Sequence, residues 1–166
     1  FFITLKDFFT KKFKNLSQNL GHFGFSLLIL SILFNNIFSS EIITNLKVGE
    51  TFKSEKFEIN FENIEQKQEK NYKVIIGKFN VKNLNDRFKI LRPELRIYNQ
   101  PNVVTSEADI KTDLLADRFM TMNLVQNQEY FNIRYQVKPF MIWIWLSVIL
   151  ISSAGLISLF KKRYEN

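Results

Sequence analysis

The sequence predicts a membrane protein of the α+β class, in which two transmembrane helices flank a small antiparallel β-rich extramembrane domain. Two long apolar stretches lie toward opposite ends of the 166-residue chain. The hydrophilic region between them alternates apolar and polar residues, as half-buried strands do. The mean hydropathy of −0.10 averages over these segments and conceals them. A single soluble domain is therefore excluded as the organisation of the chain.

Residues 1–15 are predicted to form an amphipathic segment that lies at the membrane surface. Their large apolar side chains fall roughly on one helical face, with lysines elsewhere. The tail of an earlier helix in a longer parent protein would give the same pattern. The chain opens with Phe1, so we expect a processed product or a piece of something longer.

Residues 16–38 and 139–160 are predicted to be the two transmembrane helices. A bilayer core of about 30 Å needs about 20 helical residues. The second stretch has no charge from Phe140 to Phe160, whereas Asn35 and Asn36 weaken the far end of the first. We expect Pro139 in the first turn of the second helix, where its missing N–H costs nothing.

The flanking charges predict that both termini lie on the matrix or cytoplasmic side. Lysines precede the first span, and a basic tail, residues 161–166, follows the second. Short basic segments stay on the inner side of the membrane. Residues 39–138 are then the outer domain, in the intermembrane space or periplasm. Trp143 and Trp145 would lie near the outer end of the second helix, as interfacial aromatic residues do, although contact with haem or a partner helix is an alternative.

The outer domain is predicted to be a small antiparallel β domain. Residues 57–64, 74–81 and 131–137 show the period of two that strands require. Gly77 is expected to allow a β-bulge, and residues 83–86 are expected to form a turn before a returning strand that starts at Phe88.

Composition excludes several classes of site. The chain has no cysteine, which rules out disulfides, thiol nucleophiles and cysteine-based zinc sites. It has one histidine, which is too few for a Ser-His-Asp site beside a metal cluster. The net charge of +7 comes largely from the termini, so no nucleic acid is needed to explain it. We expect four acidic residues to be solvated rather than to bind Ca²⁺, since no glycine turn is nearby: Glu107, Asp109, Asp113 and Asp117.

The order of several short motifs resembles a known family. Gly21-His22-Phe23-Gly24 opens the first apolar helix, and residues 93–98 read Pro-Glu-Leu-Arg-Ile-Tyr. Residues 106–110 read Ser-Glu-Ala-Asp-Ile, and residues 138–145 lead from Lys-Pro into the last helix. Together they resemble the C-terminal part of CcmF, the haem lyase of the cytochrome c maturation system, over nearly the whole chain from Gly21 to Tyr164.

The resemblance implies a haem-binding role for the first helix. In CcmF a histidine of this helix is an axial ligand of a b-type haem, and the matching residue here is His22. Imidazole is a good iron ligand, and a polar ring in an apolar helix needs a partner. Gly21 and Gly24 remove side chains beside it, so a flat macrocycle could approach. Alternatively, His22 lies near the headgroups and bonds a neighbouring helix or a lipid.

The chain also departs from the family pattern. The tryptophan-rich haem-handling segment of CcmF, its two outer histidines and its second membrane histidine have no counterpart here. Ser106 replaces the usual threonine. Either the missing parts lie on another polypeptide of a split CcmF, so that this chain is a subunit that cannot act alone, or the reaction centre has been lost. An abundance of Asn, Ile, Lys and Phe indicates an AT-rich genome, which favours the mitochondrial over the bacterial inner membrane.

The expected partners are the other part of the split protein, further cytochrome c maturation subunits, apocytochrome c and the lipid bilayer. Glu94 and Arg96 are either a solvated strand face or an element that shapes a partner surface. A structural subunit that descends from CcmF and scaffolds a respiratory assembly without haem chemistry is the alternative function.

Overall fold

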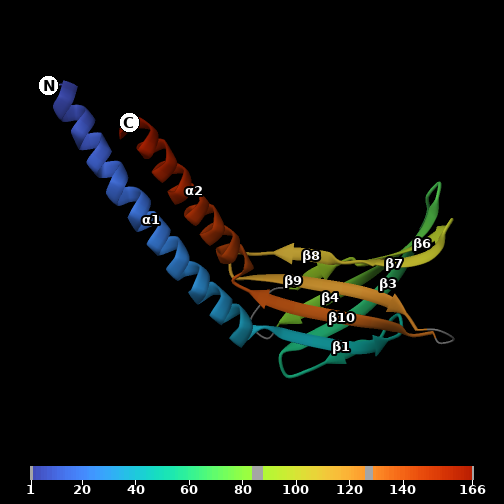
Figure 1. The fold of residues 1–166 in the computed structure, drawn as a ribbon. Coiled ribbons are helices and arrows are strands. Elements are labelled where there is room, and N and C mark those ends of the chain that lie inside the picture. Colours follow the sequence, from blue (N-terminus) through green and yellow to red (C-terminus); the bar gives the residue numbers. More distant parts are fainter. Residues whose placement is uncertain (1, 84–87, 126–128, 166) are drawn as a thin grey trace. The chain divides into compact units, whose positions relative to one another are not determined.

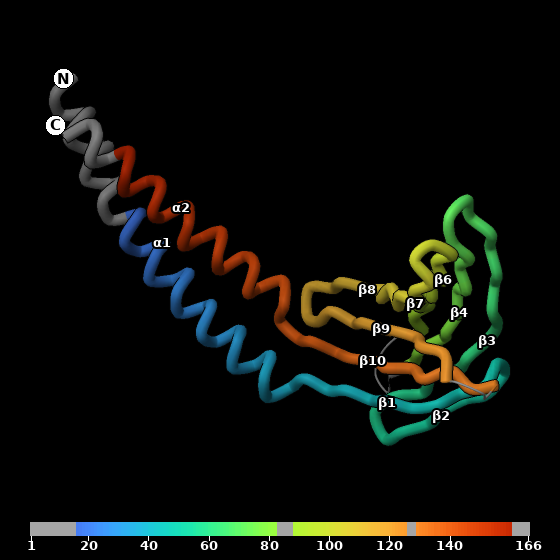
Figure 2. The backbone as a smooth tube through the Cα atoms, turned by 45° about the vertical axis from the view of Figure 1, so that its right-hand side comes forward, coloured from blue at the N-terminus to red at the C-terminus, as the bar shows by residue number. Residues whose placement is uncertain are grey.

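The computed structural model describes the backbone of residues 2–83, 88–125 and 129–165, and the side chains of residues 16–82, 88–125 and 129–160. Within these ranges the chain forms two compact units. One contains both helices together with the short segment Asp113–Ala116, and the other contains the remaining β structure. Figures 1 and 2 show the elements of each unit.

Two long helices make up the first unit. Helix α1 spans Phe2–Phe38 and helix α2 spans Met141–Glu165. They run antiparallel and side by side in both views (Figures 1 and 2). The segments predicted separately as 1–15 and 16–38 are therefore parts of one continuous helix. By length and composition, Leu16–Phe38 and Met141–Phe160 are each long and apolar enough to cross a membrane.

The second unit is a β-sandwich. Its described residues form a four-stranded sheet in the order β1-β10-β9-β8, and a six-stranded sheet in the order β2-β3-β4-β6-β7 with β5 beside β4. Neighbouring strands for which a register is described pair antiparallel. The strands are β1 (Ser40–Leu46), β2 (Thr51–Lys53), β3 (Phe57–Gln68), β4 (Tyr72–Asn83), β5 (Lys89–Leu91), β6 (Glu94–Asn99), β7 (Asn102–Glu107), β8 (Asp109–Thr112), β9 (Ala116–Leu124) and β10 (Phe131–Pro139).

The core of the sandwich lies between the two sheets. Phe61 of β3 stacks on Phe79 of β4 with ring centroids 4.2 Å apart, and both side chains are fully buried. The other sheet contributes Met120, Met122 and Ile133, which are buried in the same cluster. Inward apolar residues from both sheets therefore close one core, as in other sandwiches.

The predicted strands are present, with two local corrections. Gly77 does not carry a bulge: the register shift lies on the neighbouring strand, between Phe61 and Asn63. A Cβ at Gly77 would lie 2.6 Å from a ring carbon of Phe79 and 2.8 Å from the sulfur of Met122. The glycine is needed for core space rather than for a bulge. The predicted turn at 83–86 lies mostly outside the described residues.

The second correction concerns the start of α2. Pro139 ends strand β10, and the helix begins two residues later at Met141. Between them Phe140 has a left-handed backbone with φ of 61°. This conformation is costly for a bulky residue, and it ends the extended strand before the helix starts.

Candidate haem-binding helix and outer polar cluster

The glycines of the Gly-His-x-Gly motif face α2. A Cβ at Gly24 would lie 3.0 Å from the Cγ1 atom of Ile151 and 3.2 Å from its backbone nitrogen. A Cβ at Gly21 would lie 3.6 Å from the Cβ of Ala154. The absence of side chains at these positions lets the two helix backbones approach closely, as small residues do in membrane helix pairs.

Other residues on the same face of α1 also contact α2. The Ser17 hydroxyl donates a hydrogen bond to the Ala154 carbonyl at 2.8 Å. Toward the other end, the Asn35 amide donates to the Pro139 carbonyl at 2.6 Å. Asn35, which weakened the predicted span, thus caps the point where α2 begins. We call residues 17, 21, 24 and 35 of α1 the helix seam.

His22 lies on a different face of α1 from the helix seam. At about 100° per residue, it is turned well away from Gly21 and Gly24. Its side chain is exposed, and among the described residues it has no hydrogen-bond partner. One turn away on the helix surface lie Phe25, which is 58% exposed, and the exposed polar side chains of Gln18, Asn19 and Ser26. His22 is therefore the one titratable side chain of the segment 16–38, on a helix face that carries both apolar and uncharged polar residues.

The chemistry of this position allows His22 to act as a ligand of an external group. An exposed imidazole can coordinate a group that approaches from outside the helix pair. Within the described chain no other histidine exists to supply the opposite ligand. In the structure, the side of Gly21 and Gly24 that lacks a side chain faces α2. That these glycines make room for a haem stays a prediction.

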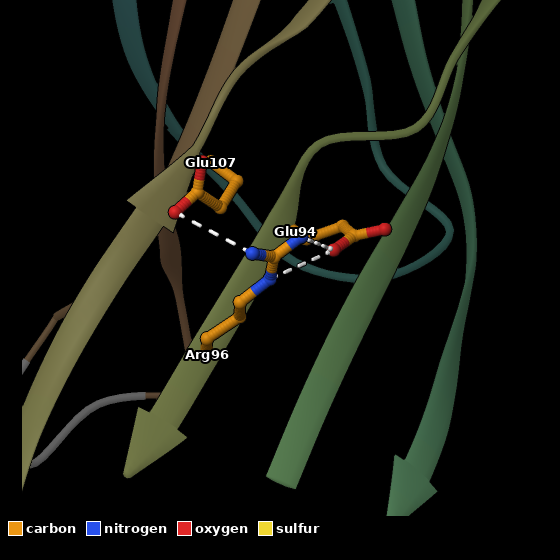
Figure 3. A network of polar contacts seen from close by, with 3 residues as sticks. All are labelled: Glu94, Arg96 and Glu107. Carbon is orange, nitrogen blue, oxygen red and sulfur yellow. Dashed lines mark hydrogen bonds and ion pairs between the residues drawn. The ribbon is translucent and has the colours of Figure 1, made fainter. Parts of the chain in front are cut away.

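A second polar group lies on the outer face of the six-stranded sheet (Figure 3). The Arg96 guanidinium contacts Glu94 through Nε at 3.2 Å and Nη2 at 3.0 Å, and Glu107 through Nη1 at 3.8 Å. Hydrogen bonding to Glu94 raises the pKa of Arg96. Arg96 also lies over the ring of Tyr72, which contacts Tyr98 at 5.1 Å.

This cluster is held together by strand register. Arg96 pairs with Val74 on one side and with Thr105 on the other, and Glu94 pairs with Glu107. Half-exposed Tyr and Arg side chains on a sheet face are typical of contact surfaces. The sequence pattern predicts Glu94 and Arg96 as candidates for a partner surface, but it does not predict Tyr72. Its alignment depends on the β4–β6 pairing, which the local pattern does not specify.

The acidic residues do not gather around a cation. Among the described residues, no group of three His, Cys, Asp or Glu side chains could hold a metal ion. One Asp109 oxygen accepts a hydrogen bond from the Arg92 backbone at 2.6 Å, and the other lies 3.6 Å from Lys111. Ser106, the substituted position of its motif, donates its hydroxyl to the Met122 carbonyl at 2.8 Å and so holds β7 to the core strand β9.

Comparison with known proteins identifies the sandwich. A family model described as the CcmF C-terminal beta-sandwich matches residues 37–139, which is more than half of the chain. "Cytochrome c-type biogenesis protein CcmF" of Haemophilus influenzae is 25% identical over 88% of this chain, and its counterpart of Escherichia coli is 24% identical over 87%. In both cases the match covers only 22% of the relative.

A solved structure shares the fold of both units. "Cytochrome c Heme Lyase CcmF" matches with a TM-score of 0.66 at 17% identity, over 90% of this chain and 25% of that one. "Cytochrome c-type biogenesis protein ccl1" of Rhodobacter capsulatus is 29% identical over 76% of the chain and 19% of its own length. These relatives are bacterial, so they give no support to the expected mitochondrial location. The chain spans about a fifth of the curated relatives that it matches.

Proposed function

Because the chain belongs to the CcmF family through its C-terminal β-sandwich, we propose that it is the C-terminal part of a CcmF-type cytochrome c haem lyase. In this proposal His22 contributes one axial ligand to a b-type haem within the membrane. The observation that carries the proposal is the exposed imidazole of His22, which has no hydrogen-bond partner among the described residues and is the one titratable side chain of the segment 16–38. The names of the relatives favour this role over a scaffold without haem chemistry.

Membrane insertion accounts for the surface of the helix pair. Side chains such as Ile29, Leu33, Ile149 and Leu159 are 46%, 52%, 60% and 67% exposed, although they are strongly apolar. Such a surface is stable in lipid but not in water. We propose an inner membrane location with both termini on the cytoplasmic or matrix side, following the basic flanks.

His22 then lies about 9 Å along the span from Leu16, at 1.5 Å per residue. A bound haem supplies an iron centre that can change its oxidation state. The chain's own contribution is to hold the imidazole at a fixed depth, because the helix seam locks α1 against α2. Gly21 and Gly24 support this position by allowing the close packing, and they would border the haem only where the seam leaves their backbone uncovered.

The opposite ligand and the haem-handling segment must come from outside this chain. The chain matches only about a fifth of its relatives' length, which is consistent with a second polypeptide or a longer parent. We propose that the outer sandwich binds this remainder, other cytochrome c maturation subunits or apocytochrome c. The cluster of Arg96, Glu94, Tyr72 and Tyr98 is the best candidate contact surface, since it combines charge with half-exposed aromatic rings.

The test is an optical spectrum of the purified assembly, dithionite-reduced minus oxidised, for wild type and His22→Ala. We expect a b-type α band in the wild type and its loss in the variant. Ser26→Ala is the matched control, because residue 26 lies one turn along the same helix face and is also exposed. Its band should be unchanged. Restoration of the band in His22→Ala by added imidazole would show that ligation, not folding, was lost.

A wild-type assembly that lacks haem while its partners still co-purify would contradict the proposal and leave a structural role. A normal spectrum in His22→Ala would remove His22 from the iron and leave the family assignment intact.

A further inference from the structure

A short turn of the sandwich is attached to the helix pair rather than to its own sheet. Residues Asp113–Ala116 connect β8 to β9, yet they cluster with the helices. The Asp113 N–H donates to the Ala116 carbonyl at 3.1 Å and closes the turn. In place of the Gly, Asn or Asp usual at the centre of such turns, this one presents Leu114 and Leu115, which are 70% and 68% exposed.

Two hydrogen bonds fix the turn to the start of α2. The indole Nε1–H of Trp143 donates to the Leu114 carbonyl at 2.8 Å. The Phe140 N–H donates to the Leu115 carbonyl at 2.8 Å. Both backbone carbonyls of the leucine pair are therefore satisfied by residues 140 and 143, and only the apolar side chains project outward.

Contacts from α1 also fix the position of this turn along the helix pair. The Phe140 ring lies 5.3 Å from that of Phe34, and Asn35 donates to the Pro139 carbonyl. Ile37 and Phe38, at the end of α1, are 67% and 60% exposed. The exposed leucines therefore lie at the same end of the helix pair as these apolar residues, where Trp145 is also 64% exposed.

We propose that Leu114 and Leu115 insert into the outer leaflet and form a third, non-spanning membrane contact. This inference rests on the proposed membrane insertion of α1 and α2. Moving an exposed leucine pair from water into the acyl region is favourable by roughly 25 cal/mol per Å² of apolar area removed from water. Trp143 sits where an interfacial indole prefers to be, with its ring in the apolar zone and its N–H bonded to the turn. The occupant of this surface is lipid because it continues the lipid-facing surface of the helices.

The absence of cysteine makes a direct test possible, since one introduced cysteine carries the only label. Leu114→Cys, labelled with an environment-sensitive fluorophore, is reconstituted in the full chain in phosphatidylcholine vesicles. Quenching is measured with aqueous iodide and with lipids that carry a nitroxide either near the headgroup or deep in the acyl chain. Two comparison sites are exposed apolar residues: Val48→Cys in the sandwich, 47% exposed, and Ile149→Cys on α2, 60% exposed.

We expect the label at 114 to be quenched most by the shallow nitroxide and to be shielded from iodide. The label at 149 should respond most to the deep nitroxide, and the label at 48 to iodide. A label at 114 that behaves like the one at 48 would overturn the inference while leaving the spanning helices in place. Shielding of residue 114 from iodide and from both lipid quenchers would mean that protein covers the turn, which also overturns it. A label at 149 that no lipid quencher reaches would refute membrane insertion itself.

Discussion

Residue 24 shows how one missing side chain sets the geometry of the helix pair. Gly24 is buried against Ile151 and Leu150, and a Cβ there would lie within 3.2 Å of the Ile151 backbone nitrogen. Gly21, one turn earlier, has only ordinary contact distance to Ala154. The two glycines of one motif therefore differ in how strictly they are required, and His22 between them depends on the packing that they permit.

Gly24→Ala is expected to destabilise the helix pair by about 1–3 kcal/mol, because the new methyl group must push a backbone atom rather than a flexible side-chain end. The measurement is thermal unfolding in detergent followed by tryptophan fluorescence. Both tryptophans of the chain, Trp143 and Trp145, lie in α2, so the signal reports on this unit.

Gly21→Ala and Gly155→Ala are the controls. The first adds a methyl group at 3.6 Å from its nearest neighbour, and the second adds one with nothing within 4 Å. Both should leave the transition unchanged or raise it slightly, since alanine favours the helix by about 1 kcal/mol over glycine. Equal melting temperatures for all three variants would show that the close approach at Gly24 is not required.

Gly77 makes the corresponding demand inside the sandwich. Gly77→Ala is expected to lower the free energy of unfolding by about 1–3 kcal/mol, because its Cβ would overlap the buried Phe79 ring and the Met122 sulfur. Denaturant unfolding followed by the β-sheet circular dichroism signal measures the change. The double variant with Met122→Ala should lose less free energy of unfolding than the sum of the two single losses, because the shorter side chain at residue 122 leaves space for the new methyl group. Strict additivity would exclude this steric explanation.

At the scale of elements, the strand pair of β1 and β10 connects the sandwich to the two helices, since β1 follows α1 and β10 precedes α2. They pair along the full length of β1, from Ser40 opposite Val137 to Leu46 opposite Phe131. Arg134 of β10 contacts Glu41 of β1 at 2.6 Å. Hydrogen bonds from Arg134 and then Gln136 lower the pKa of Glu41 below its ordinary value of 4.5.

A lowered carboxyl pKa gives a defined pH dependence. The ionised Glu41 stabilises the folded state above its ordinary pKa of 4.5, and this contribution disappears as the pH falls through the lower folded-state value. Glu41→Gln should therefore be less stable than wild type at pH 7, by a small amount because the pair is exposed, and the difference should vanish in acid. Glu55→Gln, outside this strand pair, is the charge-matched control. A difference that persists unchanged at low pH would show that packing, not ionisation, is responsible.

The sequence specifies elements better than their pairing. Period-two alternation in residues 57–64 and 131–137 predicts strands correctly, because each strand has one buried face. The division of strands into two sheets depends on contacts between distant segments, which no local pattern encodes. The same limit applies to the site: His22 is identifiable from the sequence as the one titratable residue of the apolar segment 16–38. The sequence does not specify which face of α1 packs against α2, whereas in the structure Ser17, Gly24 and Asn35 share that face.

At the scale of the whole molecule, both helices end at the same strand pair. Phe38 precedes β1 and Pro139 ends β10, and these strands are hydrogen-bonded neighbours. With the proposed membrane insertion of both helices, we expect the two termini on one side of the membrane and the loop between the helices, residues 39–138, on the other. The basic residues at both ends of the chain favour the cytoplasmic or matrix side for the termini in this proposal.

This topology predicts the accessibility of single cysteines in membranes. Val48→Cys, in the sandwich, should react with a membrane-impermeant maleimide in intact bacterial spheroplasts that express the chain. Tyr164→Cys, in the basic C-terminal segment, should react only after the membrane is permeabilised. Removing positive charge should change this result. Replacement of Lys161, Lys162 and Arg163 by Gln should increase external labelling at residue 164, because the short basic tail no longer holds that end inside. Equal labelling of both sites in intact spheroplasts would contradict the two-span topology, since two helices joined by one outer domain cannot place residues 48 and 164 on the same side.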